Sequence, residues 1–227
     1  MKKFLSLYLI LATCYIAQAQ EKPDLSKESG KLQVGMRSAL SAFSDDGAMG
    51  HGVGGQFRIK FGSRLNSDWF LDYITTDIAG LAKRTDYHIG WSVLYYPFNN
   101  EIKKGKLTPY ILAGHCFDWT DVTKNGGIYT SLNLPQKRFA SAVQSGLGAH
   151  YNLADNFDVS LTAQYMIHLG PDIHTSVFDN EITGQKDIII SREDVGLEGH
   201  LLINLSLNVY IADLWNKQGH EAEYKKK

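Results

Sequence analysis

The chain contains eight histidines, and their spacing decides which metal chemistry the sequence could support. Histidine ligands usually occur in short motifs such as H-x-H or H-E-x-x-H. The sequence has neither motif, and no His/Cys pair stands at ligand spacing. Four histidines that we expect on the inner face of neighbouring strands could still converge: His88, His150, His168 and His200. We interpret that convergence as coincidence and predict no metal site and no cofactor.

One local cluster has the residue types of a hydrolase. His168, Asp172, His174 and Ser176 follow one another near the end of an expected strand. Covalent hydrolysis needs a nucleophile and a base, usually with a third group that orients the base. Although His174 and Ser176 have the spacing of the His-x-Ser arrangement expected of a barrel lipid A deacylase, the order His-Leu-Gly-Pro-Asp-Ile-His at 168–174 does not match it. A lipid-modifying enzyme is therefore a minor alternative, and we predict that the chain is not an enzyme.

The element that would carry this cluster is the most regular stretch of the sequence, residues 157–169. Its odd positions are apolar or aromatic, and its even positions are mostly polar. Because side chains alternate faces along a strand, this is one strand with an apolar face and a polar face. It has about 13 residues, more than the roughly 5–6 of an ordinary strand. A bilayer-crossing strand needs about 9–11 residues.

The same alternation recurs along the chain. We expect strands at residues 32–43, 50–62, 69–76, 87–96, 107–118, 137–151, 157–169 and 195–211. The facing of 107–118 stays open, because Ile111 and Phe117 compete with Tyr110 and Leu112 for the apolar face. The strand at 50–62 has a charged, glycine-rich face and an aromatic face. This suits a strand whose aromatic face contacts lipid and whose charged face lines a narrow polar interior. The sequence predicts an all-β protein, an eight-stranded antiparallel up-and-down transmembrane β-barrel.

The inward positions of these strands form a polar set. Its members are Arg37, Gln56, Arg58, Lys60, His88, Gln144, His150, Asp158, Gln164, His168 and Glu198. Buried charges need partners, so we expect the cations to pair with carboxylates across the lumen. The set is best interpreted as a structural polar plug. A proton or ion path, or a ligand-triggered gate, is the alternative.

The ends of the chain have the composition of export and solvent-exposed segments. Met1-Lys2-Lys3, an apolar run and Ala17-Gln18-Ala19 predict a signal peptide at 1–19. A periplasmic leader (20–31), the barrel (32–211) and a polar tail (212–227) follow. The alternative is a lipoprotein acylated at Cys14. Loss of Lys2 and Lys3 changes the net charge from −1 to −3. That charge gives no reason to expect a nucleic-acid partner.

The connections are unequal in length. The two longest, about 119–136 and 170–194, both fall on the side opposite the termini. Outer-membrane barrels have short periplasmic turns and longer extracellular loops. We therefore expect these two loops to face the outside of the cell, where a protein partner could bind them.

Two motifs resemble those of a known family. Thr108-Pro109-Tyr110-Ile111-Leu112-Ala113-Gly114 is similar to the PY-x-x-x-G strand of small outer-membrane barrels, and Gly146-Leu-Gly148-Ala-His-Tyr151-Asn-Leu153 is similar to their G-x-G-x-x-Y-x-L hairpin. The chain resembles the outer-membrane β-barrel domain family common in Bacteroidota, with an architecture like outer membrane protein X and the barrel of outer membrane protein A. That family usually ends on a strand with a terminal aromatic residue, whereas about 16 residues follow the last strand here.

Taken together, these features predict a non-catalytic protein of the cell outer membrane, surrounded by lipid. Its role would be structural, or it would bind a partner through the two long loops or the tail. A narrow channel or small-solute transporter is one alternative. An accessory subunit of a secretion or envelope-assembly machine is another. The alternative fold is a soluble lipocalin-like barrel, which would place Arg58 and Lys60 outside.

Overall fold

The computed structural model describes residues 29–43, 49–98, 103–126, 129–181 and 184–215. They form nine strands: β1 (Lys31–Phe43), β2 (Met49–Lys60), β3 (Leu65–Ile78), β4 (Ala82–Tyr95), β5 (Leu107–Lys124), β6 (Gln136–Ala154), β7 (Phe157–Asn180), β8 (Gln185–Gly196) and β9 (Gly199–Asp213). Within these ranges there is no helix long and apolar enough to cross a membrane.

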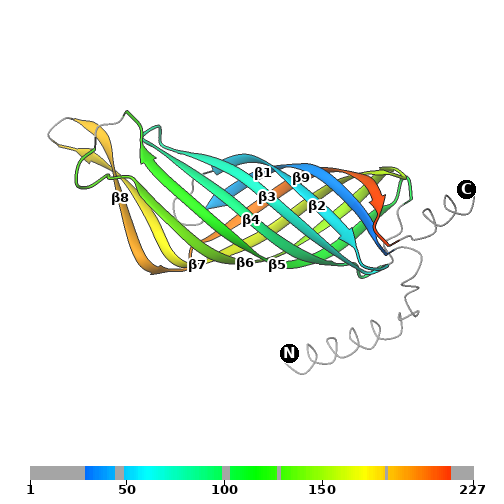
Figure 1. The fold of residues 1–227 in the computed structure, drawn as a ribbon. Helices are drawn as coiled ribbons and strands as arrows, with labels where there is room; N and C mark the ends of the chain where they lie inside the picture. Colours follow the sequence, from blue (N-terminus) through cyan, green and yellow to red (C-terminus); the bar gives the residue numbers. More distant parts are fainter. Residues whose placement is uncertain (1–28, 44–48, 99–102, 127–128, 182–183, 216–227) are drawn as a thin grey trace, which may run out of the picture.

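Eight of the strands close into an antiparallel barrel (Figure 1). Strands β1 to β7 pair in chain order, β9 pairs with both β7 and β1, and these two pairings complete the ring. Strand β8 stands apart, because it pairs only with the distal half of β7 and projects beyond the barrel. We call this side the hairpin end, and the opposite side, where β1 begins and β9 ends, the terminal end. The predicted eight-stranded antiparallel barrel is confirmed.

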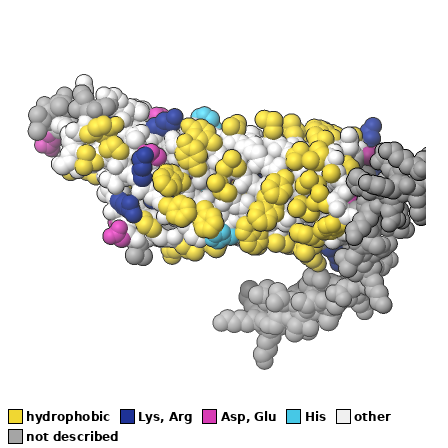
Figure 2. Space-filling model, viewed as in Figure 1, with side chains coloured by type: hydrophobic (Ala, Val, Ile, Leu, Met, Phe, Trp, Pro, Cys, Tyr) yellow, Lys and Arg dark blue, Asp and Glu magenta, His cyan; other side chains and the backbone are white. Residues whose placement is uncertain are grey.

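The two faces of the wall differ as the alternation predicts. On β2 the side chains of Val53 and Phe57 are exposed and those of Arg58 and Lys60 are buried. Figure 2 shows apolar side chains spread over the barrel surface, with charged ones gathered toward its ends. Aromatic rings pack side by side on this outer face, such as Phe57 on Trp69 at 5.9 Å between ring centroids. An apolar exterior around a polar interior is the arrangement of a transmembrane barrel, so the soluble lipocalin-like alternative is wrong.

The facing of the fifth strand, which alternation left open, is settled. Tyr110 and Leu112 are buried inside, while Ile111 and Phe117 are exposed. Glycines on the neighbouring β6 explain why a tyrosine fits there. A Cβ added to Gly148 would stand 2.4 Å from the Tyr110 ring, so the ring occupies the space that a side chain would need.

The interior alternates between apolar and polar layers. One apolar layer lies at mid-barrel and includes Phe70, Ile74, Met166 and Leu202. A second, near the terminal end, consists of Leu94, Tyr96, Tyr110 and Leu112. A third lies at the hairpin end, where Ile173, Ile188 and Ile190 pack on Ile78, Ala82 and Val122. Side chains therefore fill the barrel instead of leaving a pore.

The structure corrects the two predicted loops. Residues 119–124 continue β5, and residues 170–180 and 185–196 form a β-hairpin, so only 125–135 and 181–184 remain as connections there. Several strands also run longer than alternation indicated; β3, for example, begins at Leu65. The predicted signal peptide lies outside the described residues. The expected leader ends where β1 begins, at Lys31, and β9 continues through Asp213 into the expected tail.

Candidate functional site

The polar interior is the part of the barrel where chemistry could occur. All eleven polar residues predicted to face inward are buried, each with 6% or less of its surface exposed. They do not form one site. The structure divides them between two networks, one near each end, with the Arg37–Asp72 ion pair (Nε–Oδ1, 2.9 Å) and a Gln144–Gln164 contact between them.

The network near the terminal end centres on Arg58. Its Nη1 lies 3.4 Å from Asp158 Oδ2 and donates to Gln33 Oε1 at 3.0 Å. Its Nε lies 3.6 Å from Asp68 Oδ1. The side chain of Gln33 also donates to Asp158 Oδ2 at 2.7 Å. These contacts join β1, β2, β3 and β7 across the lumen, as a structural plug would.

His150 belongs to this network and lies apart from the other three inward histidines. Its Nδ1 lies 2.6 Å from Ser160 Oγ, and its Nε2 lies 2.8 Å from the Tyr96 hydroxyl. Ser160 donates to Asp158 Oδ1 at 2.8 Å, so a serine, a histidine and an aspartate meet here. In a catalytic triad the carboxylate contacts the far side of the imidazole, whereas here it contacts the serine. This arrangement holds the side chains together but does not activate the serine.

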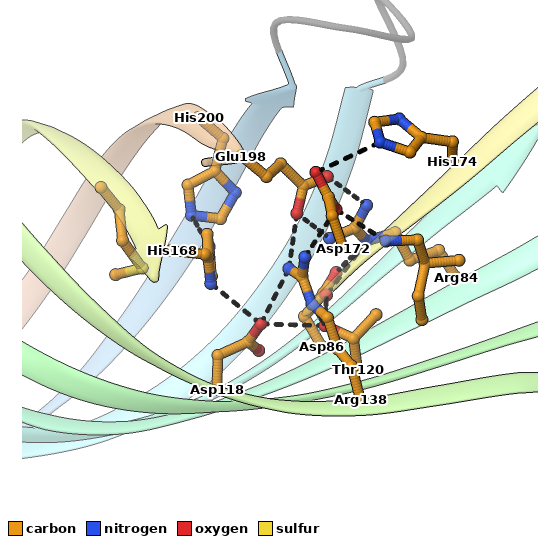
Figure 3. Close-up of polar contacts among 12 residues, drawn as sticks. Arg84, Asp86, Asp118, Thr120, Arg138, His168, Asp172, His174, Glu198 and His200 are labelled. Atoms are coloured by element: carbon orange, nitrogen blue, oxygen red, sulfur yellow. Dashed lines mark hydrogen bonds and ion pairs between the residues drawn. The ribbon is translucent and has the colours of Figure 1, made fainter. Parts of the chain in front are cut away.

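A second network, near the hairpin end, is shown in Figure 3. We call it the hairpin-end network: Arg84, Asp86, Asp118, Thr120, Arg138, Asp172 and Glu198. Arg84 binds both oxygens of Glu198, at 2.6 and 2.7 Å. Arg138 reaches three carboxylates, with Nη1 2.8 Å from Asp172 Oδ1 and Nη2 2.5 Å from Glu198 Oε2 and 3.1 Å from Asp118 Oδ2. The network ties β4, β5, β6 and β7 to the residue that precedes β9.

Beside this network lie three inward histidines that the sequence had suggested could meet. We call them the histidine cluster: His88 on β4, His168 on β7 and His200 on β9. One ring nitrogen of each lies within 4.8 Å of the other two. Nε2 of His168 and Nε2 of His200 are 3.4 Å apart. His168 and His200, with Asp118 below them, can be followed in Figure 3.

The predicted hydrolytic cluster does not assemble. His168 faces the lumen, where its Nδ1 lies 3.1 Å from Asp118 Oδ2. Ser176 is exposed on the projecting hairpin, eight residues further along the same strand. At about 3.3 Å per residue this separates the two by about 26 Å. Asp172 contacts His174, with 3.7 Å between Oδ2 and Nε2. Ser176 follows His174 by two residues on β7, but no hydrogen bond joins these two described side chains.

Several residues of these networks were missed from the sequence. Arg138 lies six residues before the predicted Gln144 on β6, so both side chains point to the same face of the strand. Following the alternation back from Gln144 would therefore have identified Arg138 as inward-facing. Arg84 and Asp86 precede the residues at which we expected the strand to start, although they alternate with exposed neighbours. Asp118 lies on the strand whose facing stayed open. No local signal shows which carboxylate would meet which guanidinium.

The interior leaves little free volume. The two cavities that we consider, one around Arg37 and Gln56 and one around Lys60 and Asn152, each have a volume of about 10 Å³. A cavity needs about that volume to hold one water molecule. Both are lined mainly by polar side chains, so each suits a single bound water and neither suits a solute.

Comparison with known proteins places the chain among membrane barrels. The model of a family described as "Outer membrane protein beta-barrel domain" matches residues 5–183. Comparison with curated proteins finds no match to this sequence. Among solved structures, Neisserial surface protein A shares 16% identity with a TM-score of 0.46, covering 79% of this chain and 97% of that one.

Two further solved structures are similar to the same extent. The attachment invasion locus protein Ail of Yersinia pestis shares 14% identity, with a TM-score of 0.45 and coverage of 79% of this chain and 99% of Ail. A major outer membrane protein of Thermus thermophilus shares 13% identity, with a TM-score of 0.47 and the same two coverages.

Proposed function

Because the chain belongs to the outer membrane protein beta-barrel domain family, we propose that it is a non-catalytic outer-membrane protein that binds a protein partner outside the cell. The partner would bind the β7–β8 hairpin and the adjoining residues 129–134, which we call the projecting surface. The observation that carries this proposal is that the hairpin is a packed, rigid extension with apolar side chains beyond the barrel.

The connections support an extracellular position for the projecting surface. At the terminal end, residues 61–64 between β2 and β3 and 155–156 between β6 and β7 are short turns, although the β4–β5 connection, 96–106, is longer. The hairpin end carries the long β7–β8 extension and the 125–135 connection. Outer-membrane barrels place short turns in the periplasm and longer loops outside. The hairpin end would therefore face away from the cell, with both termini in the periplasm.

Contacts at the base of the extension make it rigid. Ile173, Ile188 and Ile190 bury their side chains against β3, β4 and β5. The Ile190 N–H donates to the Leu132 carbonyl at 2.9 Å, which ties residues 129–134 to β8. Lys124 Nζ lies 2.7 Å from Asp187 Oδ1, which ties β5 to the same strand. A surface that is ordered before binding loses less entropy when a partner docks, so rigidity favours a binding role.

The projecting surface exposes apolar side chains that no bilayer would cover. Tyr129, Leu132, Leu134 and Val177 each expose 42% or more of their surface. Apolar side chains on the barrel wall contact lipid, but these four lie on the extension and its neighbouring connection. Exposed apolar groups rimmed by polar ones typically mark protein interaction sites. The charged residues Asp179, Lys186 and Glu193 supply such a rim.

The filled interior argues against the two other activities. A channel needs a continuous aqueous path, whereas apolar layers and the two ion-pair networks occupy the lumen of this barrel. An enzyme at the rim would need a nucleophile beside a base, but Ser176 stands about 26 Å along the strand from His168. The nearer His174 contacts Asp172 and Glu193 instead. An accessory role in an envelope machine remains compatible with the proposal, because it is one form of partner binding.

The proposal is tested by site-specific photo-cross-linking in intact cells. A photoreactive residue at Leu132 or Val177 should give a discrete protein adduct, and one at Leu147, on the lipid-facing wall, should not. Replacing Leu132, Leu134 and Val177 by serine should remove the adduct formed from a probe at Tyr129. Replacing the exposed charges Asp179 and Lys186 by asparagine and glutamine should leave it. Equal adducts from Leu132 and Leu147, or none from the projecting surface, would refute the proposal.

A further inference from the structure

The histidine cluster brings one nitrogen from each of three buried imidazoles within 4.8 Å of the other two, close to the arrangement of a metal site. Each of its three members has 1% or less of its surface exposed, and each comes from a different strand. Two of the nitrogens that face one another, Nε2 of His168 and Nε2 of His200, are 3.4 Å apart. Two imidazoles bound to one tetrahedral zinc ion at about 2.0–2.1 Å each must stand about 3.4 Å apart. The observed separation is therefore the one that a shared ion requires.

The other ring nitrogens are held as they are in known metal sites. A metal-bound histidine usually uses its second nitrogen to contact a carboxylate or another polar group, which fixes the ring orientation. Nδ1 of His168 lies 3.1 Å from Asp118 Oδ2, and Nδ1 of His200 lies 3.2 Å from Ser41 Oγ. These contacts leave each Nε2 directed at the other.

His88 completes the set in the same way. Its Nε2 lies 3.3 Å from Asp118 Oδ1, so one carboxylate orients two of the three rings. Neither nitrogen of the His88 ring has a partner with hydrogen-bond geometry among the described residues, although the ring is fully buried. An unpaired nitrogen in a buried ring costs free energy. A bound cation at the centre of the cluster would give one of these nitrogens a partner.

The charges around the cluster also call for a cation. The hairpin-end network buries four carboxylates, Asp86, Asp118, Asp172 and Glu198, against two guanidinium groups, Arg84 and Arg138. With neutral histidines, two negative charges remain. His174, which is partly exposed next to Asp172, could offset one of them if protonated. Buried charge without compensation is strongly unfavourable, and a divalent ion would supply both positive charges.

We propose that His88, His168 and His200 bind one divalent transition-metal ion inside the barrel, with Asp118 and Ser41 as positioning residues. Three imidazoles favour ions such as Zn²⁺ over Mg²⁺ or Ca²⁺, which prefer oxygen ligands. The arginine–carboxylate network and the apolar layer of Ile173, Ile188 and Ile190 lie between the cluster and the hairpin-end mouth. The ion would therefore bind as the barrel folds and would link β4, β7 and β9. This proposal does not depend on the projecting surface or its partner.

The test uses the full chain refolded in detergent micelles with Zn²⁺ or Co²⁺ and then dialysed. Elemental analysis should find about one Zn²⁺ per barrel, and the Co²⁺ form should show the absorption bands of a tetrahedral site. Refolding with Mg²⁺ should leave no bound ion. His88→Gln, His168→Gln and His200→Gln should each abolish binding. Ser41→Ala should weaken it about 10–100-fold, as is usual for such supporting groups.

His150→Gln is the matched control, because it removes a buried histidine from the same lumen and should leave the zinc content unchanged. Zinc content in the unmodified chain no higher than in His168→Gln would overturn the proposal. If the glutamine variants fail to fold, X-ray absorption of the zinc form decides. Three imidazole nitrogens at about 2.0–2.1 Å, with one further ligand completing the tetrahedron, support the site, and a set with fewer imidazoles refutes it.

Discussion

Replacing Arg138 by methionine should be among the most destabilising single changes in the barrel. The Arg138 side chain is fully buried and contacts Asp118, Asp172 and Glu198 together. Its Nε also donates to Thr120 Oγ1 at 3.1 Å. Because methionine fills much of the same space, the loss of stability reflects the missing charge and hydrogen bonds more than the creation of a cavity.

The magnitude follows from what the substitution leaves behind. Breaking a buried ion pair by removing one partner costs about 3–5 kcal/mol, because the remaining charge stays buried without compensation. Glu198 keeps Arg84, but Asp172 loses its guanidinium. We therefore expect Arg138→Met to lower the free energy of unfolding by about 3–5 kcal/mol. Adding Asp172→Asn should recover part of that loss, since the amide carries no charge.

Lys137→Met is the matched control, one residue earlier on the same strand. Its side chain is 62% exposed and pairs with Asp121 at 3.0 Å (Nζ–Oδ2). Exposed ion pairs contribute about 0–1 kcal/mol, so this change should be nearly neutral. Urea unfolding in lipid vesicles, followed by tryptophan fluorescence, measures both variants. If Arg138→Met and Lys137→Met differ by less than about 1 kcal/mol, the interpretation of Arg138 as a buried charge partner that the hairpin-end network requires is wrong.

Three further outcomes are expected. Gly148→Ala should destabilise the barrel by about 1–3 kcal/mol, because the new methyl group overlaps the Tyr110 ring. Gly55→Ala is the control: no atom lies nearer than 3.9 Å to the added Cβ, so this change should be close to neutral in the same assay. The ammonium of Lys124 holds the pKa of Asp187 below its usual value. A depressed carboxylate pKa stabilises the fold above the unfolded pKa and loses that effect as pH falls through the folded pKa. The hairpin should therefore become more sensitive to protease in that acidic range, and Asp187→Asn should remove the pH dependence. Planar bilayers containing the protein should show no steady single-channel conductance, and reproducible unitary steps would contradict the filled lumen.

Much of the architecture could be predicted from residue alternation. On β2 and β4 the period-two pattern is nearly uninterrupted, because one face must contact lipid and the other a narrow polar interior. The pattern failed where a strand leaves that environment. Where β7 and β8 project past the barrel, both of their faces meet water or protein. Residues 170–194 therefore lack the apolar face that identifies a membrane strand, and they were predicted as a loop.

The partners inside the lumen could be predicted only as a class. The sequence indicates that Arg58 and His168 face inward, but contacts across a barrel depend on the stagger between strands. Asp158 meets Arg58 although the two are 100 residues apart. His150 and His168 share a facing, yet they belong to different layers. The alternation along a strand determines whether a side chain faces lipid or the lumen. Its depth along the barrel axis is determined by the pairing register between strands.

That dependence on register gives the lumen networks a role in assembly. Barrel closure joins β1 to β9, whose residues are far apart in sequence, so this is a slow kind of contact to form. A slip of one residue would place Arg37 in lipid. A slip of two would keep the facing but move Ser41 about 7 Å away from His200. The lipid-facing side chains remain in lipid after a two-residue slip, so they do not oppose it. The polar contacts in the lumen would be lost, and they therefore disfavour it. The polar contacts of the interior thus favour a single pairing register between β1 and β9, the two strands that close the barrel.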